Sequence, residues 1–323
     1  MAQQWSRRGF FGVAAAGLIA AGLPAACART EDDEDDPGKP VTIRHLFGET
    51  VIDGPPARVV SAGYTGQDDL LAVGVVPVGV TYWFGDQPFA VWPWARTQLG
   101  AAEPAVLTLD AGIDVDAVAA LEPDLIVATN AGVDADTYAA LSEVAPTVPQ
   151  SGPDAFFEPW RDQAATIGRA VFAGERMRGI IDGVDARFAS VAEAHPQFRD
   201  RTVMLLDGRL ERGEVVAAQG WRTEFLTAMG LRVADRLGEF GDGVRAVIPR
   251  DRIRQVLDTA DVVIWTTDSE PDADALRADP EIAAVHTPQV FTPPELSGAI
   301  AFASPLSYPV VADQLPPLLI DAL

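Results

Sequence analysis

The sequence predicts an α/β protein of two lobes with mainly parallel sheets, joined by one long helix. Apolar residues recur every three or four positions over residues 173–195, which is the spacing of one buried helix face. On both sides of this helix, short apolar segments alternate with helical ones, as they do in parallel sheets covered by helices. The chain of 323 residues is also too long for one small core.

The first residues have the layout of an export signal. The pair Arg7 and Arg8 precedes two phenylalanines and an uncharged run over residues 12–26. Paired arginines ahead of aromatic residues suggest export by the twin-arginine route. At about fifteen residues the run is shorter than the roughly 20 that a membrane-spanning helix needs. We therefore expect residues 1–26 to be an export signal that is cleaved.

Cys27 is the only cysteine in the chain and follows two alanines. This arrangement looks like a bacterial lipoprotein signal in which the cysteine is acylated, although Pro24 stands where such signals usually carry a larger aliphatic residue. Residues 27–40 contain a run of acidic side chains that repel one another, so we expect an acidic tether. The expected location is the cell envelope, with the protein exported and lipid-anchored to the outer face of the cytoplasmic membrane.

Composition restricts the partners of the chain. A net charge of −23 argues against nucleic acid and against anionic lipid headgroups. Hydrophobic residues make up 48% of the chain, which is typical of a packed body. With a single cysteine, no disulfide can form within the chain.

The N-terminal lobe, residues 41–172, should begin with a hairpin and continue with alternating strands and helices. The expected strands cover residues 41–46, 49–53, 58–61, 76–81, 124–128 and 147–148. The expected helices cover residues 67–73, 88–99, 115–121, 136–144 and 158–172.

The bridging helix is expected over residues 173–196, where Pro196 ends it. The C-terminal lobe, residues 197–323, repeats the alternation. Its expected strands cover residues 202–206, 215–218, 262–265 and 289–292. Its expected helices cover residues 221–229, 250–257 and 308–322.

Several segments together resemble the iron-siderophore substrate-binding lipoproteins of bacterial ABC importers. They are residues 58–64 (RVVSAGY), 68–74 (DDLLAVG), 76–80 (VPVGV) and 116–127 (DAVAALEPDLIV). Residues 85–94 (GDQPFAVWPW) and 300–309 (IAFASPLSYP) are similar to actinobacterial, mycobacterial-type members. The resemblance covers the whole mature chain.

The resemblance implies how such a protein works. The family has two lobes bridged by one long helix, clamps its ligand in the cleft with little hinge motion, and performs no catalysis. It implies a ferric siderophore as ligand, an ABC permease with its ATPase subunits as partners, and a monomer. Haem or cobalamin is the alternative ligand.

Independently of the resemblance, the residues after the expected strands are unusually aromatic. Ligands of open parallel sheets bind beyond the carboxyl ends of the strands. The candidate ligand-binding residues are Tyr64, Thr65, Tyr82, Trp83, Phe84, Trp92 and Asn130 in the first lobe, and Arg209, Trp221, Arg222 and Thr267 in the second. Such a lining suits a bulky, flat and partly polar ligand.

Each candidate has a purely structural alternative. A tryptophan of this set can belong to the core, and Arg209 and Arg222 can be ordinary solvated side chains. The aromatic residues of 83–94 are interrupted by glycine and prolines, which favours an irregular rim, because a loop cannot bury them all. Trp265 lies inside an apolar run and is expected in the core.

Metal, haem and enzyme sites leave weak signals. The three histidines, His45, His195 and His286, lie far apart and none is expected in the cleft, so no bare-metal site is predicted. Haem stays open, since Tyr64 or Tyr82 offers an axial ligand. Common catalytic motifs are missing from the sequence, so neither catalytic residues nor a cofactor are expected. The pair Asp68 and Asp69 is attributed to the dipole at a helix start.

The resemblance also implies two permease-docking carboxylates, one on each lobe. The family's acidic position ahead of a Leu-Lys-Pro-Asp-Leu segment is matched by Asp116, ahead of residues 121–125 (LEPDL). The family's Ser-Arg-Glu is matched by residues 249–251, which places Asp251 at the second position. Both are Asp where Glu is usual. The alternative is helix capping by Asp in a first turn.

Overall fold

The computed structural model describes residues 36–153, 156–241 and 243–323. These residues belong to one compact unit. The predictions for the export signal 1–26, for Cys27 and for most of the tether 27–40 lie outside the described residues. Within the described part of the chain, no helix is both long enough and apolar enough to cross a membrane.

The N-terminal lobe is built on a five-stranded parallel sheet in the order β5-β4-β3-β6-β7. Its strands are β3 (Val59–Ser61), β4 (Gly79–Thr81), β5 (Ala105–Leu107), β6 (Leu125–Ala128) and β7 (Thr147–Pro149). The antiparallel hairpin of β1 (Val41–His45) and β2 (Gly48–Ile52) precedes this sheet. The helices are α1 (Gly66–Ala72), α2 (Arg96–Leu99), α3 (Val115–Ala119), α4 (Ala135–Val144) and α5 (Trp160–Ala170).

The C-terminal lobe is built on a mixed sheet in the order β11-β9-β8-β12-β13, with β10 pairing β8. Its strands are β8 (Thr202–Asp207), β9 (Val215–Ala218), β10 (Arg232–Val233), β11 (Arg245–Ile248), β12 (Val262–Thr266) and β13 (Gln289–Phe291). The helices are α7 (Glu224–Ala228), α8 (Ile253–Leu257), α9 (Glu270–Ala278), α10 (Pro280–Ala283), α11 (Pro294–Phe302) and α12 (Tyr308–Ala322). β9 runs antiparallel to β8 and β11, and the other pairs are parallel.

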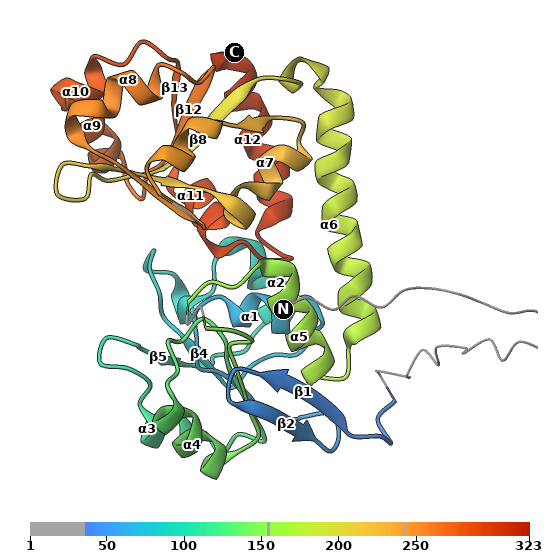
Figure 1. Cartoon of the computed structure of the whole chain (residues 1–323). Coiled ribbons are helices and arrows are strands. Elements are labelled where there is room, and N and C mark those ends of the chain that lie inside the picture. The colour runs from blue at the N-terminus through green and yellow to red at the C-terminus, as the bar shows by residue number, and fades with distance from the viewer. Residues whose placement is uncertain (1–35, 154–155, 242) are drawn as a thin grey trace, which may run out of the picture. The chain divides into compact units, whose positions relative to one another are not determined.

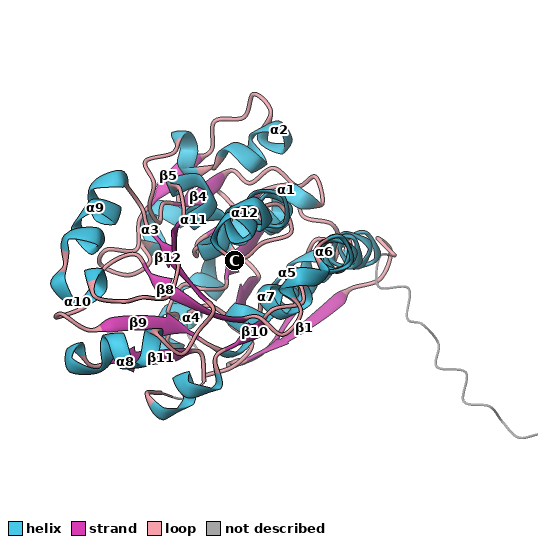
Figure 2. Cartoon of the chain, turned by 90° about the horizontal axis from the view of Figure 1, so that it is seen from above, coloured by secondary structure: helices cyan, strands magenta, loops and turns pink. Residues whose placement is uncertain are grey.

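Alternate residues of the central strands pack on opposite faces of this second sheet. Val203 and Leu205 of β8 belong to one hydrophobic cluster, whereas Met204 and Leu206 belong to another. Figure 2 shows α8, α9 and α10 on one side of these strands and α7 and α12 on the other. Both faces of a strand are therefore buried, which explains the continuous apolar runs that predicted these strands.

The long helix α6 (Gly174–Ala194) connects the two lobes and runs alongside both of them (Figure 1). Its 21 residues span about 32 Å at about 1.5 Å per residue. Met177, Val184 and Phe188 are its buried large side chains, at the spacing of one helix face. The predicted fold class, two α/β lobes joined by one long helix, is confirmed.

The predicted helix over residues 88–99 is wrong. The chain forms two 3₁₀ turns, Pro88–Ala90 and Pro93–Ala95, and only then the short helix α2. Proline has no N–H to donate inside a helix, and Phe89 and Ala90 both adopt positive φ, at 54° and 52°. This segment is therefore an irregular rim. The sequence also gave no indication of β5, β10, β11, α9, α10 or α11.

Candidate functional site

Three connected cavities run between the two lobes. The inner cavity has a volume of about 100 Å³ and is lined by Thr65, Asn130, Phe157, Glu158, Trp160, Gln163, Leu205, Asp207, Ala218, Trp221, Arg222, Thr266 and Ile300 to Ala303. The middle cavity, of about 480 Å³, lies between Trp83 and Phe84 of one lobe and Asp207 to Glu211, Thr266 and Asp268 of the other. The outer cavity, of about 490 Å³, is lined by residues of the 84–93 rim and by Arg209, Asp268 and Glu295.

The cavities are contiguous because they share lining residues. Asp207, Thr266 and Ala301 line both the inner and the middle cavity. Phe84, Arg209 and Asp268 line both the middle and the outer cavity. Together they form one cleft whose walls come from the carboxyl ends of strands in both sheets, which is where ligands of such sheets bind.

The floor of the inner cavity is a buried hydrogen-bond network. The Thr65 hydroxyl oxygen accepts hydrogen bonds from Asn130 Nδ2 and Gln163 Nε2, each at 3.0 Å. Asn130 Oδ1 in turn accepts from the backbone N–H groups of Phe157 and Glu158. Thr65 and Asn130 both adopt positive φ, at 68° and 52°, which is a costly conformation for a β-branched threonine. This network holds Phe157 in place.

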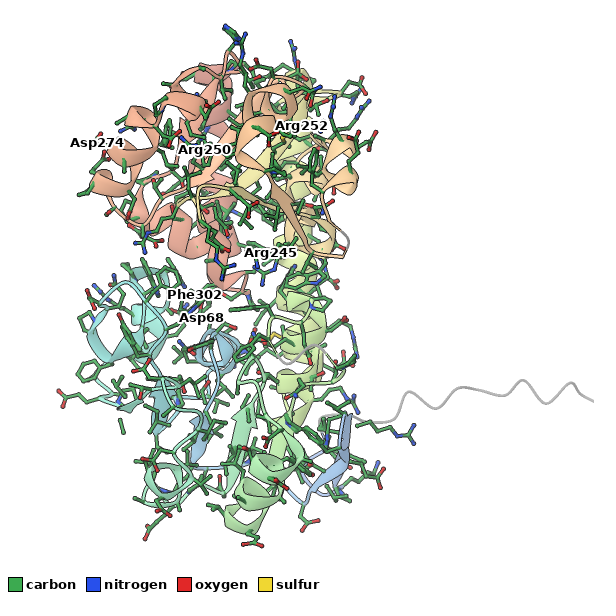
Figure 3. All side chains as sticks on the ribbon, turned by 60° about the vertical axis from the view of Figure 1, so that its left-hand side comes forward. Asp68, Arg245, Arg250, Arg252, Asp274 and Phe302 are labelled. Atoms are coloured by element: carbon green, nitrogen blue, oxygen red, sulfur yellow. The ribbon has the colours of Figure 1, made fainter. Side chains whose placement is uncertain are left out.

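An aromatic cluster forms the wall contributed by the N-terminal lobe. Trp83 stacks on Tyr64 with ring centroids 5.4 Å apart and contacts Phe157 at 4.9 Å. Phe302, at the end of α11 in the C-terminal lobe, lies 5.5 Å from Trp83. Figure 3 shows Phe302 where the two lobes meet. The wall therefore continues from one lobe to the other.

Arg222 is the cation of the inner cavity. Its guanidinium lies 4.8 Å from the ring centroid of Phe157 and 5.2 Å from that of Trp221. Its Nε atom is buried and has no hydrogen-bond partner among the described residues. Burial lowers the pKa of Arg222, and the negative charge of Asp207 opposes this effect. A hydrogen-bond donor thus remains available beside the cavity.

The structure brings most of the sequence-predicted residues to the cleft. Thr65, Asn130, Trp221 and Arg222 line the inner cavity, and Trp83, Phe84, Trp92 and Arg209 line the other two. Tyr64, Tyr82 and Thr267 line none of the three. Tyr64 stacks on Trp83, and Tyr82 donates a hydrogen bond to Asp86. Thr267 is 2% exposed and donates to the Thr292 carbonyl oxygen.

Two of the tryptophans turn out to be core residues. Trp92 is 4% exposed and stacks on Trp94 at 4.9 Å, although it also belongs to the lining of the outer cavity. Trp265 is fully buried, as predicted.

Arg209 is engaged with Asp268 and Asp272 in ion pairs of 3.4 and 3.1 Å.

Sequence reasoning missed several lining residues, notably Phe157, Gln163, Asp207 and Phe302. Asp207 ends the strand β8, so the rule of inspecting strand ends would have found it. Phe157 and Gln163 lie around the start of α5, which was treated only as the helix leading to α6. Phe302 belongs to a helix that was not predicted.

Asp68 and Asp69 form a buried acidic pair, so the dipole of α1 is an incomplete explanation for them. They are 0% and 1% exposed. Asp68 Oδ2 accepts hydrogen bonds from Trp94 Nε1 at 2.8 Å and from the Ser304 hydroxyl of the other lobe at 2.6 Å. Asp69 Oδ2 accepts from Gln163 Nε2 at 2.7 Å. Burial raises the pKa of Asp68 to about 6 and raises that of Asp69 well above its ordinary value.

The two docking candidates are exposed carboxylates without an ion-pair partner among the described residues. Asp116 lies in the first turn of α3, but Asp114 is the residue that caps this helix, accepting from the Ala117 N–H at 3.0 Å. Asp251 lies in the 3₁₀ turn Arg250–Arg252, whose preceding residue Pro249 makes no side-chain cap. Neither side chain makes a capping hydrogen bond, but both lie in a first turn, where the helix dipole favours a carboxylate, so this alternative to docking stands.

None of the three histidines lines the three cavities. His45 is buried beside Thr50, and its Nε2 lies 3.0 Å from the threonine hydroxyl. In the part of the chain that the structure describes, no group of three or more His, Cys, Asp or Glu side chains is arranged to hold a metal ion.

Comparison with known proteins places the chain in a family. A family model described as "Periplasmic binding protein" matches residues 59–295. A crystal structure of a periplasmic solute binding protein from Mycobacterium smegmatis is 61% identical, with a TM-score of 0.83, and the match covers 88% of this chain and 99% of that one. The chain therefore belongs to the periplasmic binding protein family.

More distant relatives carry more specific names. "Probable siderophore-binding lipoprotein YfiY" of Bacillus subtilis is 26% identical over 197 residues, which cover 58% of this chain and 57% of that protein. The chain thus matches a little over half the length of this relative. PiaA of Streptococcus pneumoniae in complex with ferrichrome has a TM-score of 0.71 at 23% identity, covering 87% and 98% of the two chains, and shares the fold.

Proposed function

We propose that this protein is the extracytoplasmic substrate-binding component of an ABC importer, and that it captures a ferric siderophore in the cleft between its lobes. The observation that carries the proposal is the cleft itself. Three contiguous cavities lie between an aromatic wall of the N-terminal lobe and the strand ends of the C-terminal lobe, with a buried arginine donor at the inner end. The names of the relatives agree with this ligand class.

The sizes of the cavities fit a large chelate rather than a small ion. Pockets for organic ligands typically measure about 300–1,000 Å³. The inner cavity of about 100 Å³ accepts only one arm of a ligand, whereas the middle and outer cavities of about 480 and 490 Å³ accept the body of a chelate. The faces of Trp83 and Phe84 suit flat apolar portions, and Arg222 offers a donor to an oxygen of the ligand.

A titration of intrinsic tryptophan fluorescence tests the proposal. Ferric siderophores of several classes, haem and cobalamin are added separately to the purified mature protein. We expect at least one ferric siderophore to bind with a Kd below about 10 µM, equivalent to roughly −7 kcal/mol. If only haem or cobalamin binds in this range, the siderophore assignment is wrong.

We infer that the protein binds without catalysis and without a resident cofactor. Its most perturbed carboxyl groups, those of Asp68 and Asp69, are engaged with neighbouring side chains and line none of the three cavities. Recovery of the ligand unchanged after prolonged incubation with the protein, checked by mass spectrometry, is the expected result.

The anchor and the partners complete the proposal. Acylation of Cys27 after export would hold the monomeric body at the outer face of the cytoplasmic membrane. Loss of fatty-acid labelling in a Cys27→Ala variant checks the anchor. The exposed Asp116 and Asp251 are proposed to dock on the permease of an importer driven by its ATPase subunits, and arginines of that permease would be their counterparts.

A further inference from the structure

The walls of the middle cavity combine carboxylates with aromatic faces. On one side lie Trp83 and Phe84, which follow β4. On the other side Asp207 ends β8, and Asp268 follows β12. An aromatic face attracts a cation through its negative quadrupole, and a carboxylate attracts it through its charge. Two independent features of this cavity therefore favour the same kind of ligand group.

Asp207 is the carboxylate that is free to receive such a group. No hydrogen bond or ion pair of its side chain occurs among the residues that the structure describes. By contrast, Asp268 is paired with Arg209, and Glu211 is paired with Arg245. Desolvation within the cleft and the negative charges of Glu211 and Asp268 raise the pKa of Asp207, and the positive charges of Arg222 and Arg245 oppose this rise without reversing it.

The side chains that line the rest of the cleft also carry more negative than positive charge. The outer cavity adds the carboxylates of Asp86 and Glu295, and the cation lining it is Arg209, which already has two acidic partners. Among the described residues, Arg222 is the only cation lining the inner cavity, where the carboxylates of Glu158 and Asp207 also lie. A ligand entering the cleft thus meets negative potential first, which attracts cations and repels anions.

We propose that the ferric chelate taken by this site carries a protonated amine, and that the amine is held in the middle cavity between Asp207 and the faces of Trp83 and Phe84. This inference rests on the proposed function and adds the charge class of the ligand to it. An oxygen-rich end of the same ligand then points toward Arg222. The arrangement orients the ligand as well as selecting it.

Three matched ligands test the inference, because they share one iron-binding group and differ only at a remote end. They are ferrioxamine B, which ends in an ammonium group, its neutral N-acetyl derivative and its anionic N-succinyl derivative. Affinities are measured by fluorescence titration at low and high salt. We expect the ammonium form to bind roughly tenfold tighter than the neutral form and the succinyl form to bind most weakly, with the differences shrinking in salt.

Two variants with the same change of charge locate the effect. Asp207→Asn should remove most of the preference for the ammonium form over the N-acetyl form. Asp274→Asn is the control, since Asp274 lies on α9 away from the junction of the lobes (Figure 3) and is paired with Arg277. The control should retain the wild-type preference. A circular dichroism spectrum confirms that both variants are folded.

The possible results distinguish a failure of the amine inference from a failure of the proposed siderophore-binding function. Equal binding of the three ligands, tighter binding of the succinyl form, or an unchanged preference in Asp207→Asn overturns the inference and leaves the proposed function standing. The same holds if another ferric siderophore binds and none of the three does. If no ferric siderophore binds at all, the proposed function fails and the inference falls with it.

Discussion

At the scale of single residues, the tryptophans of the cleft differ in what they do. Trp221 is half-buried, lines the inner cavity and packs under the Arg222 guanidinium. We predict that Trp221→Ala weakens siderophore binding by about 1–3 kcal/mol, the usual range for an aromatic anchor, with little loss of stability. Fluorescence titration and the melting temperature measure the two effects. A variant that keeps its affinity but loses several degrees of melting temperature would show that Trp221 is a core residue.

Trp83 provides a useful contrast in the same experiment. It stacks against Tyr64, Phe157 and Phe302, so its removal takes contacts from both lobes. Trp83→Ala should therefore weaken binding by a similar amount and also lower the melting temperature.

The buried Asp68 makes the stability of the protein depend on pH. Its pKa is raised by burial from 3.8 to about 6, so folding favours the protonated form. Such a group contributes fully to stability at pH values below its pKa in the unfolded chain. This contribution is lost as the pH rises through its pKa in the folded protein. A rise of this size corresponds to about 3 kcal/mol at most.

We predict that Asp68→Asn flattens the pH dependence of stability. Between about pH 4 and pH 7 the wild type should lose stability, whereas the variant should change less, because the amide does not ionise. Denaturant unfolding at several pH values measures this. Asp261→Asn is the control, because this half-buried carboxylate pairs with Arg201 and makes no hydrogen bond to Asp68 or Asp69. A variant with the same slope as the wild type would contradict the assignment.

At the scale of residues, inspecting the segments after the expected strands and one helix start located part of the cleft lining. Trp83 follows β4 and Arg222 lies in the turn before α7, and both line the cavities, whereas Tyr82 and Thr267 directly follow strands and line none of them. The contacts that complete the site join residues far apart in the chain, such as Asp68 with Ser304 and Trp83 with Phe302. No local pattern encodes such pairs, so Phe302 and Gln163 were missed.

At the scale of elements, buried and periodic segments were predicted well and irregular ones were not. The helix α12 has the predicted bounds of 308–322. α11 was missed because nearly all of its residues from Leu296 to Phe302 are buried, which leaves no polar stripe to mark its period. β5 was missed because it is a three-residue edge strand with Ala105 and Val106 exposed.

The docking prediction concerns Asp116 in the first turn of α3 and Asp251 in the 3₁₀ turn that leads into α8. We predict that a double Asp116→Lys and Asp251→Lys variant binds the ferric siderophore normally but does not support its import. Both carboxylates are exposed and neither caps its helix, so reversing their charges should leave the fold intact while opposing the arginines expected on the permease.

Uptake of radioactive iron by cells that carry only this variant measures the effect. A double Asp136→Lys and Asp274→Lys variant is a suitable control, because it also replaces two aspartates by lysines and so makes the same change of net charge. Both residues lie in helices, and neither was matched to the family's docking positions. Import at the wild-type rate by the Asp116 and Asp251 variant would refute the docking assignment.

At the scale of the whole body, the two lobes share one hydrophobic core. A single cluster contains Val127 of the first sheet, Phe188 of α6 and Ile264 of the second sheet. Polar contacts also cross between the lobes, since Arg161 of α5 pairs with Asp185 of α6 and with Glu224 of α7. The alternation of strands and helices predicted two lobes, but it carries no information on how far they are fused. That depends on side chains meeting across the junction.

The shared core predicts that the body unfolds in one step. A fully cooperative transition requires each lobe to lose stabilising contacts when the other unfolds, and the cluster around α6 provides this coupling. Scanning calorimetry of the mature protein should therefore show a single peak whose calorimetric and van't Hoff enthalpies agree. Phe188→Ala removes a ring that packs on Phe225 and Tyr308, and it should destabilise the whole body by about 3–5 kcal/mol.

Leu141→Ala distinguishes one cooperative unit from two. Leu141 is fully buried in a cluster that belongs to the N-terminal lobe alone. In a fused body this substitution lowers the melting temperature of the entire transition, by several degrees for a loss of about 2–5 kcal/mol. Saturating siderophore should raise the melting temperature of the same single transition, because the siderophore binds only the folded cleft. If the lobes were independent, Leu141→Ala would split the peak and move one part, leaving the C-terminal lobe to melt at its original temperature.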